Sequence, residues 1–379
     1  MSQPSPSNRP LRHVIVGVGA AVLGMHRPAF SLPTVQLVGV TDVNAAVAQA
    51  RAKELGCPAY PDYGQMIEAT RPDIVVIMTP HPFHAEIAIT ALEAGCHVLC
   101  EKPMAVHAGE ADAMISAADR TGRLLAVSLQ FRHRPEIITA KRLIDEGRLG
   151  QLQRIDVLAC WTRAERYYRQ TPWRGTWKGE GGGVLMNQAP HNLDLACHLA
   201  GPPSRVVAWT RTRLQPIQAE DTAHAMLQWS GGALGSLHVS TAEADTGDRI
   251  ELLGTGGRLV IRPGSLDVEL FEPDLRQHIH ETDVLWSSPA AHPFPVSLPP
   301  GEADHAAVYR NLHAAILDGT PLMADGAQGR LSLELANAIT LSSQRDTAVD
   351  LPLDRAAYSV LLAELQAGEF VADQQTSSE

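Results

Sequence analysis

The first 130 residues alternate short apolar runs with stretches of helical periodicity. The run at 74–78 (IVVIM) has no polar position, as a strand that is buried on both faces requires. Alternating strand and helix units of this length predict a doubly wound parallel sheet over 11–130, with right-handed crossovers. The predicted strands lie at 13–17, 35–41, 73–79, 97–100 and 124–129, and the predicted helices lie at 45–55, 63–70, 83–94 and 108–121.

The pattern changes after residue 130. A helical stretch over 134–146 ends at Gly147, and short strand-like segments follow. Short strands joined by tight turns predict an antiparallel sheet, so we expect an α+β domain over 131–370, between polar tails at 1–10 and 371–379. The strands of this domain are predicted at 152–163, 204–213, 221–229, 233–240, 249–254 and 257–262, and its late helices at 303–318 and 325–345.

Composition narrows the class of protein. The chain has 379 residues, 45% hydrophobic and 19% charged, so it can bury the cores of two domains. The net charge of −11 argues against nucleic acid or an anionic membrane as the main partner. No apolar run is long enough to span a bilayer, and the polar N-terminus carries no secretory signal. Five irregularly spaced cysteines fit a reducing compartment, so we expect a cytoplasmic enzyme.

A glycine-rich turn follows the first predicted strand. Glycines allow the backbone to approach a pyrophosphate at a helix N-terminus, and a carboxylate at the end of the next strand, Asp42, can hold a ribose diol. The charge of Asp42 would repel a 2′-phosphate, so we expect NAD rather than NADP. Pro28 suits only a first helical turn, so we expect a long phosphate loop. The predicted cofactor contacts in the turn are Gly17, Gly19, Ala20, Ala21 and Val22.

Two further motifs, TPHPFH at 79–84 and EKP at 101–103, follow later strands of the same predicted sheet. The carboxyl ends of neighbouring parallel strands face one crevice, so we expect both motifs to meet the cofactor there. Lys102 is placed to polarise a reacting oxygen and to lower the pKa of a neighbouring base. The residues expected at the cofactor from this edge are Thr79, Pro80, His81, His84, Glu101, Lys102 and Gln130.

A second-domain motif reads GGGVLMNQAPHNLD over 181–194. Pro190 suits the first turn of a helix, so we expect a helix that starts near Asn187. Asn187 and His191 would then lie one above the other on one helical face. An asparagine can orient a hydroxyl but cannot take a proton, which leaves the acid–base work to His191 and Lys102.

Aromatic and arginine residues gather just upstream, over 163–177. Aromatic rings can stack on the C–H face of a polyhydroxylated ring while arginines donate to its hydroxyls. Core packing beneath a surface loop is the alternative. Two adjacent tyrosines cannot both face inward on a strand, which favours substrate binding. The residues expected at a substrate from this stretch are Arg163, Tyr167, Tyr168, Trp173 and Arg174.

The sequence CHVLC at 96–100 looks like a metal-binding cluster. It coincides with a predicted buried strand, where cysteine behaves as a small hydrophobic residue. No second ligand pair follows at zinc spacing, so we expect no metal site.

In their order and spacing, the GxG turn, TPxxxH, EKP and GGGxxxNxxxH resemble the Gfo/Idh/MocA family, from about residue 11 to 350. The resemblance implies a Rossmann domain followed by an open-faced sheet domain. It also implies NAD(P)-dependent oxidation or reduction of a sugar, a cyclitol or a nucleotide form of these, by a homodimer or homotetramer built on the second sheet. It assigns Lys102, His191 and Asn187 to catalysis and to substrate contact. Most relatives carry aspartate in place of Asn187, and this is a departure.

Two other functions stay open on these residues. A glycosidase of the same fold would oxidise and re-reduce its substrate with a tightly held NAD, and would release an aglycone without net NADH. A non-catalytic regulator that binds a dinucleotide is the second alternative. The presence of both Lys102 and His191 argues against the regulator.

Overall fold

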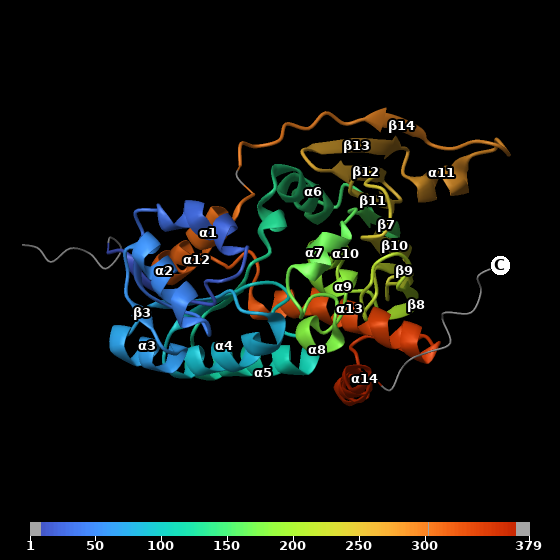
Figure 1. Ribbon diagram of the computed structural model, residues 1–379. Helices are drawn as coiled ribbons and strands as arrows, with labels where there is room; N and C mark the ends of the chain where they lie inside the picture. Colours follow the sequence, from blue (N-terminus) through green and yellow to red (C-terminus); the bar gives the residue numbers. More distant parts are fainter. Residues whose placement is uncertain (1–8, 302, 369–379) are drawn as a thin grey trace, which may run out of the picture.

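The computed structural model describes residues 9–301 and 303–368. The chain forms two sheets with helices around them (Figure 1). The first sheet has six parallel strands in the order β3-β2-β1-β4-β5-β6, and the order changes direction at β1. Ligands of such sheets bind at the carboxyl ends of the strands beside this switch point. The strands are β1 Leu11–Val16, β2 Val35–Thr41, β3 Ala59–Tyr60, β4 Ile74–Ile77, β5 His97–Cys100 and β6 Leu125–Val127.

Helices pack on both faces of the first sheet, which confirms the doubly wound architecture. Strand β4 is buried at every position, as its uninterrupted apolar sequence predicts. Side-chain caps begin two of the helices, where Asn44 accepts from the N–H groups of Ala46 and Val47, and Asp62 accepts from Gln65. The very short β3 was not predicted. The helices are α1 Leu23–Phe30, α2 Ala45–Leu55, α3 Tyr63–Thr70, α4 His84–Glu93 and α5 Ala108–Thr121, and a 3-10 turn at His81–Phe83 precedes α4.

The expectation of a long phosphate loop, based on Pro28, is wrong. Helix α1 begins at Leu23 and contains Pro28 in its interior. The chain enters the helix through a tight turn in which Leu23 N–H donates to Ala20 O over 3.2 Å. The proline lies near the end of this short helix, where the missing N–H removes only one intrahelical bond.

The second sheet has nine strands in the order β14-β13-β12-β11-β7-β10-β9-β8-β15. Strands β7 and β10 pair in parallel at its centre, and the other pairs are antiparallel, so the mainly antiparallel sheet is confirmed. Its last strands were not predicted. The strands are β7 Leu152–Cys160, β8 Arg205–Arg211, β9 Thr222–Gln228, β10 Leu234–Ser240, β11 Arg249–Gly254, β12 Gly257–Arg262, β13 Ser265–Glu272, β14 Ala290–Pro293 and β15 Val349–Asp350.

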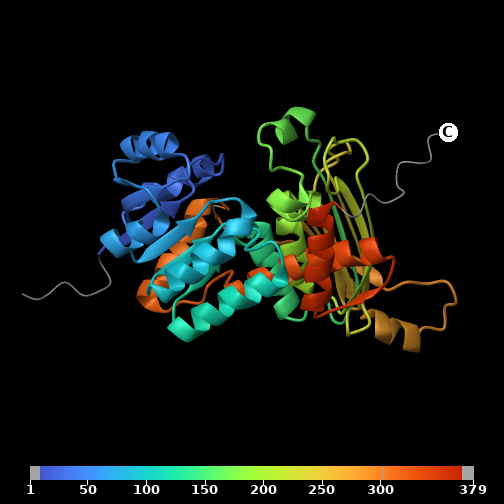
Figure 2. The ribbon, with the colours of Figure 1, turned by 60° about the horizontal axis from the view of Figure 1, so that its bottom comes forward.

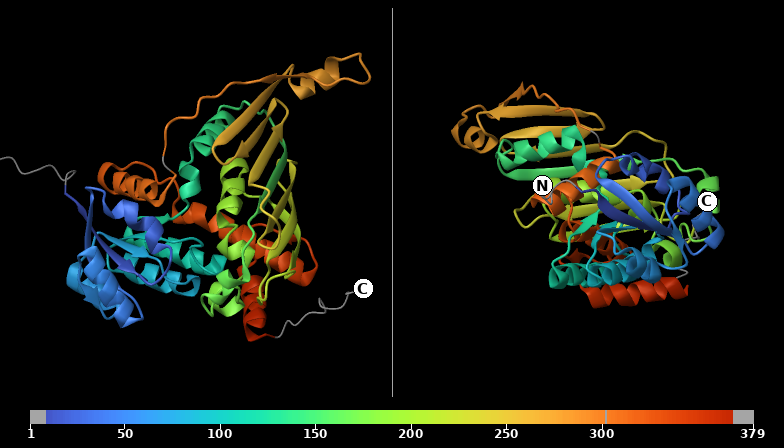
Figure 3. Two further views of the ribbon diagram at one scale, coloured as in Figure 1. Left: turned by 45° about the horizontal axis from the view of Figure 1, so that its top comes forward. Right: turned by 90° about the vertical axis from the view of Figure 1, so that its left-hand side faces the viewer.

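The two faces of the second sheet differ. In Figure 2 the helices lie on the side of the sheet that faces the first domain, and no described helix covers the opposite side. The open side exposes apolar residues, among them Leu158, Trp209 and Met226. The segment with α11 (Leu275–Glu281) extends away from the edge of this sheet (Figure 3).

The remaining helices belong to the second half of the chain. They are α6 Pro135–Asp145, α7 Glu165–Arg169, α8 Trp177–Glu180, α9 Val184–Asn187, α10 Pro190–Ala200, α12 His305–Asp318, α13 Gly326–Arg345 and α14 Arg355–Ala367. Helix α12 returns to the first sheet, where Tyr309 and Leu312 share a core with Ile15. The boundary expected at residue 131 therefore leaves out one helix of the first core, because an amphipathic helix packs wherever its apolar face is covered.

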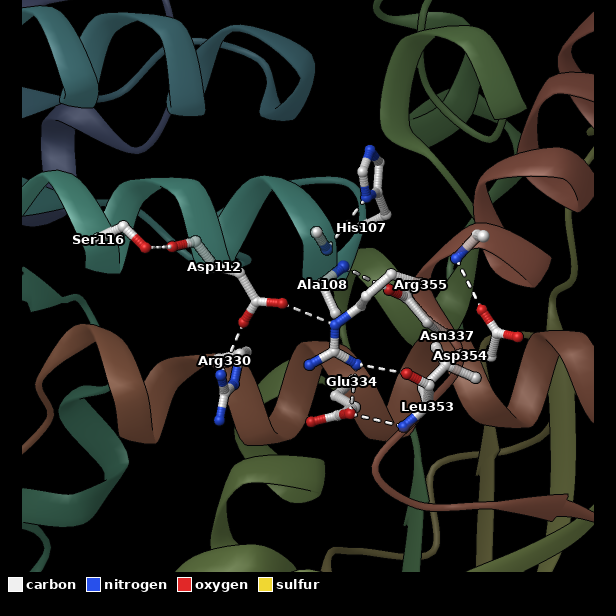
Figure 4. Close-up of polar contacts among 12 residues, drawn as sticks. His107, Ala108, Asp112, Ser116, Arg330, Glu334, Asn337, Leu353, Asp354 and Arg355 are labelled. Carbon is white, nitrogen blue, oxygen red and sulfur yellow. Dashed lines mark hydrogen bonds and ion pairs between the residues drawn. The ribbon is translucent and has the colours of Figure 1, made fainter.

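Helix α13 links the two halves of the molecule. It packs against α5 of the first domain and against β8 of the second sheet. Figure 4 shows polar contacts at this place, where Asp112 of α5 pairs with Arg330 of α13 and with Arg355 of α14, at 2.6 and 2.7 Å. Asn337 Oδ1 also accepts from the N–H of Ala108 over 3.0 Å. Helix α13 thereby connects the two sheets, which lie on either side of the site described below.

At the N-terminus, Arg9 pairs with Asp73 at 2.7 Å, so this end of the expected tail is anchored to the domain. Residues 1–8 and 371–379 of the expected tails lie outside the described residues. Among the described residues, no helix is both long enough and apolar enough to cross a membrane.

Candidate active site

The glycine turn brings the ends of β1, β2 and β4 together. Gly17 has φ +89°, and a Cβ there would lie 2.8 Å from the backbone nitrogen of Thr79. Only glycine fits such a close approach at positive φ. Gly19 N–H donates to Asp42 Oδ2 over 2.8 Å, and Asn44 N–H donates to Asp42 Oδ1 over 2.9 Å. The Asp42 carboxylate is therefore held at the turn, where a ribose would lie.

Both histidines of the TPHPFH motif after β4, His81 and His84, contact backbone carbonyls within the protein. His84 is buried, and its two ring nitrogens lie 2.7 Å from Thr79 O and 2.9 Å from Pro103 O, so it ties together the loops after β4 and β5. His81 Nδ1 lies 3.1 Å from Glu180 O of the second domain. These contacts occupy both histidines within the protein, whereas the buried Thr79 Oγ1 has no partner among the described residues.

Glu101 lies in a buried cluster with two histidines. Its Oε1 is 2.9 Å from His26 Nε2 on α1 and 3.4 Å from His305 Nε2 on α12. Burial acts to raise the pKa of Glu101, but the hydrogen bonds from these histidines outweigh it and hold the pKa well below its ordinary value. His26 Nδ1 also lies 3.0 Å from Tyr309 Oη. The Glu101 carboxylate is thus an anion that two helices hold beneath Lys102.

Lys102 crosses from the first domain to the second. Its Nζ donates to the backbone carbonyl of Asn187 over 2.7 Å. Burial lowers the pKa of Lys102, while the nearby carboxylates of Glu101 and Glu180 oppose that shift. A lysine with a lowered pKa exchanges a proton more readily than an exposed one.

His191 lies in the first turn of α10. Its ring stacks on Phe131, with ring centroids 4.2 Å apart, and its buried Nδ1 has no partner among the described residues. Burial, followed by the positive charge of Lys102, lowers the pKa of His191 well below 6.5. The ring is therefore neutral at pH 7 and can accept a proton.

Asn187 and His191 do not share a helix, so the helix predicted to start at Asn187 is wrong. Helix α9 ends at Asn187, and α10 begins at Pro190. The break follows from Pro190, which has no N–H to continue the hydrogen-bond ladder from α9. Asn187 instead turns its amide toward Tyr167, whose Oη donates to Asn187 Oδ1 over 3.1 Å.

Glu180 is a site residue that the sequence analysis missed. It is buried at the end of α8, and its carboxylate accepts from the N–H of Gly175 and from Asn187 Nδ2. Burial raises the pKa of Glu180, partly offset by these bonds and by Arg174. The glutamate directly before the GGG run was the only signal in the sequence.

The aromatic stretch forms a hydrogen-bonded wall around Asn187. Tyr167 Oη accepts from Arg174 Nη1 over 2.6 Å and from Gln188 Nε2 over 3.1 Å. The Arg174 guanidinium also lies over the rings of Tyr167 and Trp173.

Two other residues of the aromatic stretch, Tyr168 and Arg163, make different contacts. Tyr168 is buried and its Oη lies 2.8 Å from Thr241 Oγ1, so it anchors α7 to the sheet. Arg163 lies 5.7 Å from the ring of Tyr167. The adjacent tyrosines lie on the short helix α7 rather than on a strand, so the strand argument does not apply to them.

Buried ionisable side chains hold the two helices that carry the site residues, α9 and α10. Arg132 forms a two-point ion pair with Asp194 of α10, at 2.8 and 2.6 Å, and both side chains are 1% exposed. Glu220 Oε1 accepts from the N–H groups of Gly183 and Leu185 at the start of α9, over 2.9 and 3.0 Å. Burial raises the pKa of Glu220 to about 7.

The residues present fit a dinucleotide. The glycine turn presents backbone without side chains, and Asp42 is held where a ribose diol would bind. Several buried polar atoms, at the strand ends of the first sheet and at α9 and α10, have no partner among the described residues, as groups that await a ligand would. They are Thr79 Oγ1, Ser128 Oγ, Gln130 Oε1, Gln188 Oε1 and His191 Nδ1.

Two family models match the chain. The model of the oxidoreductase family with an NAD-binding Rossmann fold (Gfo/Idh/MocA) matches residues 11–129. The model of the Gfo/Idh/MocA C-terminal domain matches residues 137–260.

Individual proteins resemble the chain over most of its length. Levoglucosan dehydrogenase of Pseudarthrobacter phenanthrenivorans is 28% identical, over 86% of this chain and 91% of that protein. D-glucoside 3-dehydrogenase of Escherichia coli is 27% identical, over 91% of this chain and 99% of that protein. The crystal structure of the WlbA dehydrogenase of Bordetella pertussis, in complex with NADH and UDP-GlcNAcA, superposes with a TM-score of 0.80 at 30% identity. That superposition covers 92% of this chain and 99% of the WlbA chain.

The order of the motifs, the two sheets and the matched models agree on one assignment. The chain belongs to the Gfo/Idh/MocA family of oxidoreductases and carries that family's NAD-binding Rossmann domain.

Proposed function

We propose that this protein is an NAD-dependent sugar dehydrogenase that oxidises a ring hydroxyl to a carbonyl. The observation that carries the proposal is the electrostatic coupling of Lys102 with His191. The partly buried lysine of the first domain lies close enough to the buried histidine of the second for its charge to lower the pKa of that histidine. An enzyme that removes a proton and a hydride from one H–C–O–H group needs a base and a positive charge at this place.

The bound nicotinamide would supply the redox chemistry by accepting the hydride from the substrate carbon. A ring nitrogen of His191 takes the hydroxyl proton, and the Lys102 ammonium stabilises the negative charge that develops on the oxygen. The carbonyl of Asn187 holds Lys102 Nζ in place. Tyr167 and the amide of Asn187 orient the sugar hydroxyls, and Glu180 fixes that amide.

The preference for NAD over NADP rests on Asp42. Both of its carboxylate oxygens accept backbone N–H bonds, which leaves the charge facing the ribose position. A 2′-phosphate would meet this carboxylate. The ribose 2′-OH can instead donate to it.

The relatives support a sugar as substrate, because the two curated relatives bear the names of a levoglucosan and a glucoside dehydrogenase. A second candidate is an anionic nucleotide sugar, of the class bound in the WlbA crystal structure. Arg163 and Arg174, which flank Tyr167, favour that candidate because guanidinium groups bind phosphates and carboxylates.

The assembly and location are part of the same proposal. We infer a homodimer or homotetramer formed through the open face of the second sheet, where Leu158, Trp209 and Met226 are exposed. All five cysteines are free, which suits the cytoplasm.

A substrate panel tests the function. Neutral sugars, cyclitols and UDP-linked uronic acids are incubated with NAD⁺, and NADH is followed by its absorbance. We expect net NADH from at least one sugar class. Release of an aglycone without NADH would assign the chain to the glycosidase alternative, and binding of NADH without any turnover would assign it to the regulator.

His191→Ala tests the base. We expect kcat/KM of the native enzyme to rise with pH through one ionisation below pH 6.5, because burial lowers the pKa of His191. The variant should lose about two to four orders of magnitude in kcat/KM and lose this ionisation. His198→Ala, on the same helix, is the matched control and should keep both.

A further inference from the structure

The open face of the second sheet carries a group of side chains that the proposed reaction does not use. Strands β7, β10, β9 and β8 place Leu158, His238, His224 and Trp209 in one row, because each residue is paired with the next across the sheet. Cys160 lies two residues beyond Leu158 and therefore points to the same side. This side is turned away from the first domain (Figure 2).

Three of the side chains at this place converge. Glu243, in the loop after β10, accepts from Cys160 Sγ over 3.6 Å through Oε2, and its Oε1 lies 2.9 Å from His238 Nε2. The three potential ligand atoms all lie within 4.8 Å of one another. The loop itself is anchored, since Thr162 Oγ1 donates to the backbone carbonyl of Glu243 over 2.6 Å.

One ligand atom from each residue lies within 4.8 Å of the other two, so small side-chain movements would bring all three to the separations of a tetrahedral zinc site. With Zn–S near 2.3 Å and Zn–O near 2.1 Å, the sulfur and oxygen ligands of one ion lie about 3.6 Å apart. The Nε2–Oε1 separation would have to open by about 0.5 Å to reach the corresponding edge. Glu243 can make this movement because its side chain is 43% exposed.

His224 completes the arrangement. Its Nδ1 lies 3.2 Å from His238 Nδ1, the ring nitrogen that points away from Glu243. When His238 binds a metal through Nε2, its Nδ1 carries the proton and donates to His224. A ligating histidine in proteins is usually held by such a hydrogen bond from its second nitrogen.

We propose that Cys160, His238 and Glu243 bind one zinc ion on the open face of the second sheet, with His224 as the residue that orients His238. Thiolate, imidazole and carboxylate together are a typical donor set for zinc. The fourth ligand would come from water or from the facing subunit of the oligomer proposed above. The second cluster of possible ligands, His26, Glu101 and His305, belongs to the active site described above.

The metal changes the state of the cysteine. Without a cation, burial and the neighbouring Glu243 raise the pKa of the Cys160 thiol to about 11, so the thiol is protonated at pH 7. Binding of Zn²⁺ forms the Zn–S bond and releases that proton to solvent, while the proton on His238 moves from Nε2 to Nδ1. No oxidant or reductant takes part.

Metal titration of the chelator-treated protein tests the site. We expect one equivalent of Zn²⁺ by calorimetry, and with Co²⁺ a thiolate-to-cobalt charge-transfer band of the same stoichiometry. Cys160→Ser should abolish the band, and Zn²⁺ should raise the Tm of the native protein but not of this variant. Cys57→Ser, at a free and half-buried cysteine, is the matched control and should keep the band.

Two further variants keep the test decisive if Cys160→Ser fails to fold. Glu243→Gln, at a partly exposed position, should weaken zinc binding to the folded protein. His224→Gln should weaken it about 10- to 100-fold without removing the charge-transfer band, because this residue only orients a ligand. A band that survives in Cys160→Ser, or zinc binding that Glu243→Gln leaves unchanged, would overturn the proposal.

Discussion

The two sides of the active site hold buried glutamates in opposite ways. On the first-domain side, Glu101 accepts from two histidines, and its pKa is well below the ordinary value. On the second-domain side, Glu180 accepts mainly from neutral N–H groups, and burial raises its pKa. Burial disfavours both anions, so the partners decide the outcome. The site therefore places a carboxylate with a lowered pKa next to Lys102 and one with a raised pKa beside Asn187.

Lys102 lies between these two carboxylates, and both act to raise its pKa against burial. The comparison shows why a lysine and not an arginine suits this position. The balance of two carboxylates against burial can tune the pKa of a lysine, whereas an arginine stays charged in every such environment.

Lys102→Met removes the positive charge on which the carboxylates of Glu101 and Glu180 both act. We expect turnover to fall by about two to four orders of magnitude, because the charge that stabilises the developing alkoxide is lost. NADH binding should change little, which fluorescence titration can check. Lys178→Met, at an exposed lysine of α8, is the control. Turnover within a few-fold of the native rate would show that Lys102 has no part in the chemistry.

Glu220 is another buried glutamate of the second domain with a raised pKa, which is about 7 instead of the ordinary 4.5. Between these pH values the folded protein holds a proton that the unfolded chain has released, so stability falls as pH rises through this range and levels off above it. Glu220→Gln should remove up to about 3 kcal/mol of this dependence. Urea unfolding at pH 5 and pH 8 measures it, with the exposed Glu68→Gln as control. An unchanged dependence would contradict the assignment to Glu220.

Glu101→Gln and Glu180→Gln compare the two sides directly. The fold stabilises the anion of Glu101 but not that of Glu180, so a neutral isostere should cost more at Glu101. We expect Glu101→Gln to lower the free energy of unfolding by about 1–3 kcal/mol at pH 7 and Glu180→Gln by less. Denaturant unfolding of both variants at one pH decides this. An equal loss would mean that burial alone sets the behaviour of both residues.

Asp42→Asn is the smallest perturbation and concerns a carboxylate that is only partly buried. The asparagine oxygen can still accept from Gly19, while the charge that repels a 2′-phosphate is lost. We expect the ratio of the NADPH and NADH dissociation constants to fall by about tenfold, or 1.4 kcal/mol. A native enzyme that binds NADPH as tightly as NADH would already contradict the proposed preference.

The first domain was predicted well because its signals are local. The fully apolar strand β4 and the capped helices α2 and α3 carry their own pattern, and the predicted spans of both helices agree with the structure. The close approach of the glycine turn to Thr79 of the TPHPFH motif followed from the rule for the carboxyl ends of parallel strands. The spans of β13, β14 and α14 were missed, since the sequence analysis assigned no pattern to those segments.

The two-sheet architecture, the cofactor motifs and the presence of Lys102 and His191 could be predicted from the sequence, because each depends on residues close together in the chain. Which side chains meet across long separations became clear only from the three-dimensional packing. Glu101 meets His305 because α12 returns to the first sheet, and Cys160 meets Glu243 through the pairing of β7 with β10. Such contacts depend on which apolar faces cover one another, and no local pattern encodes that choice.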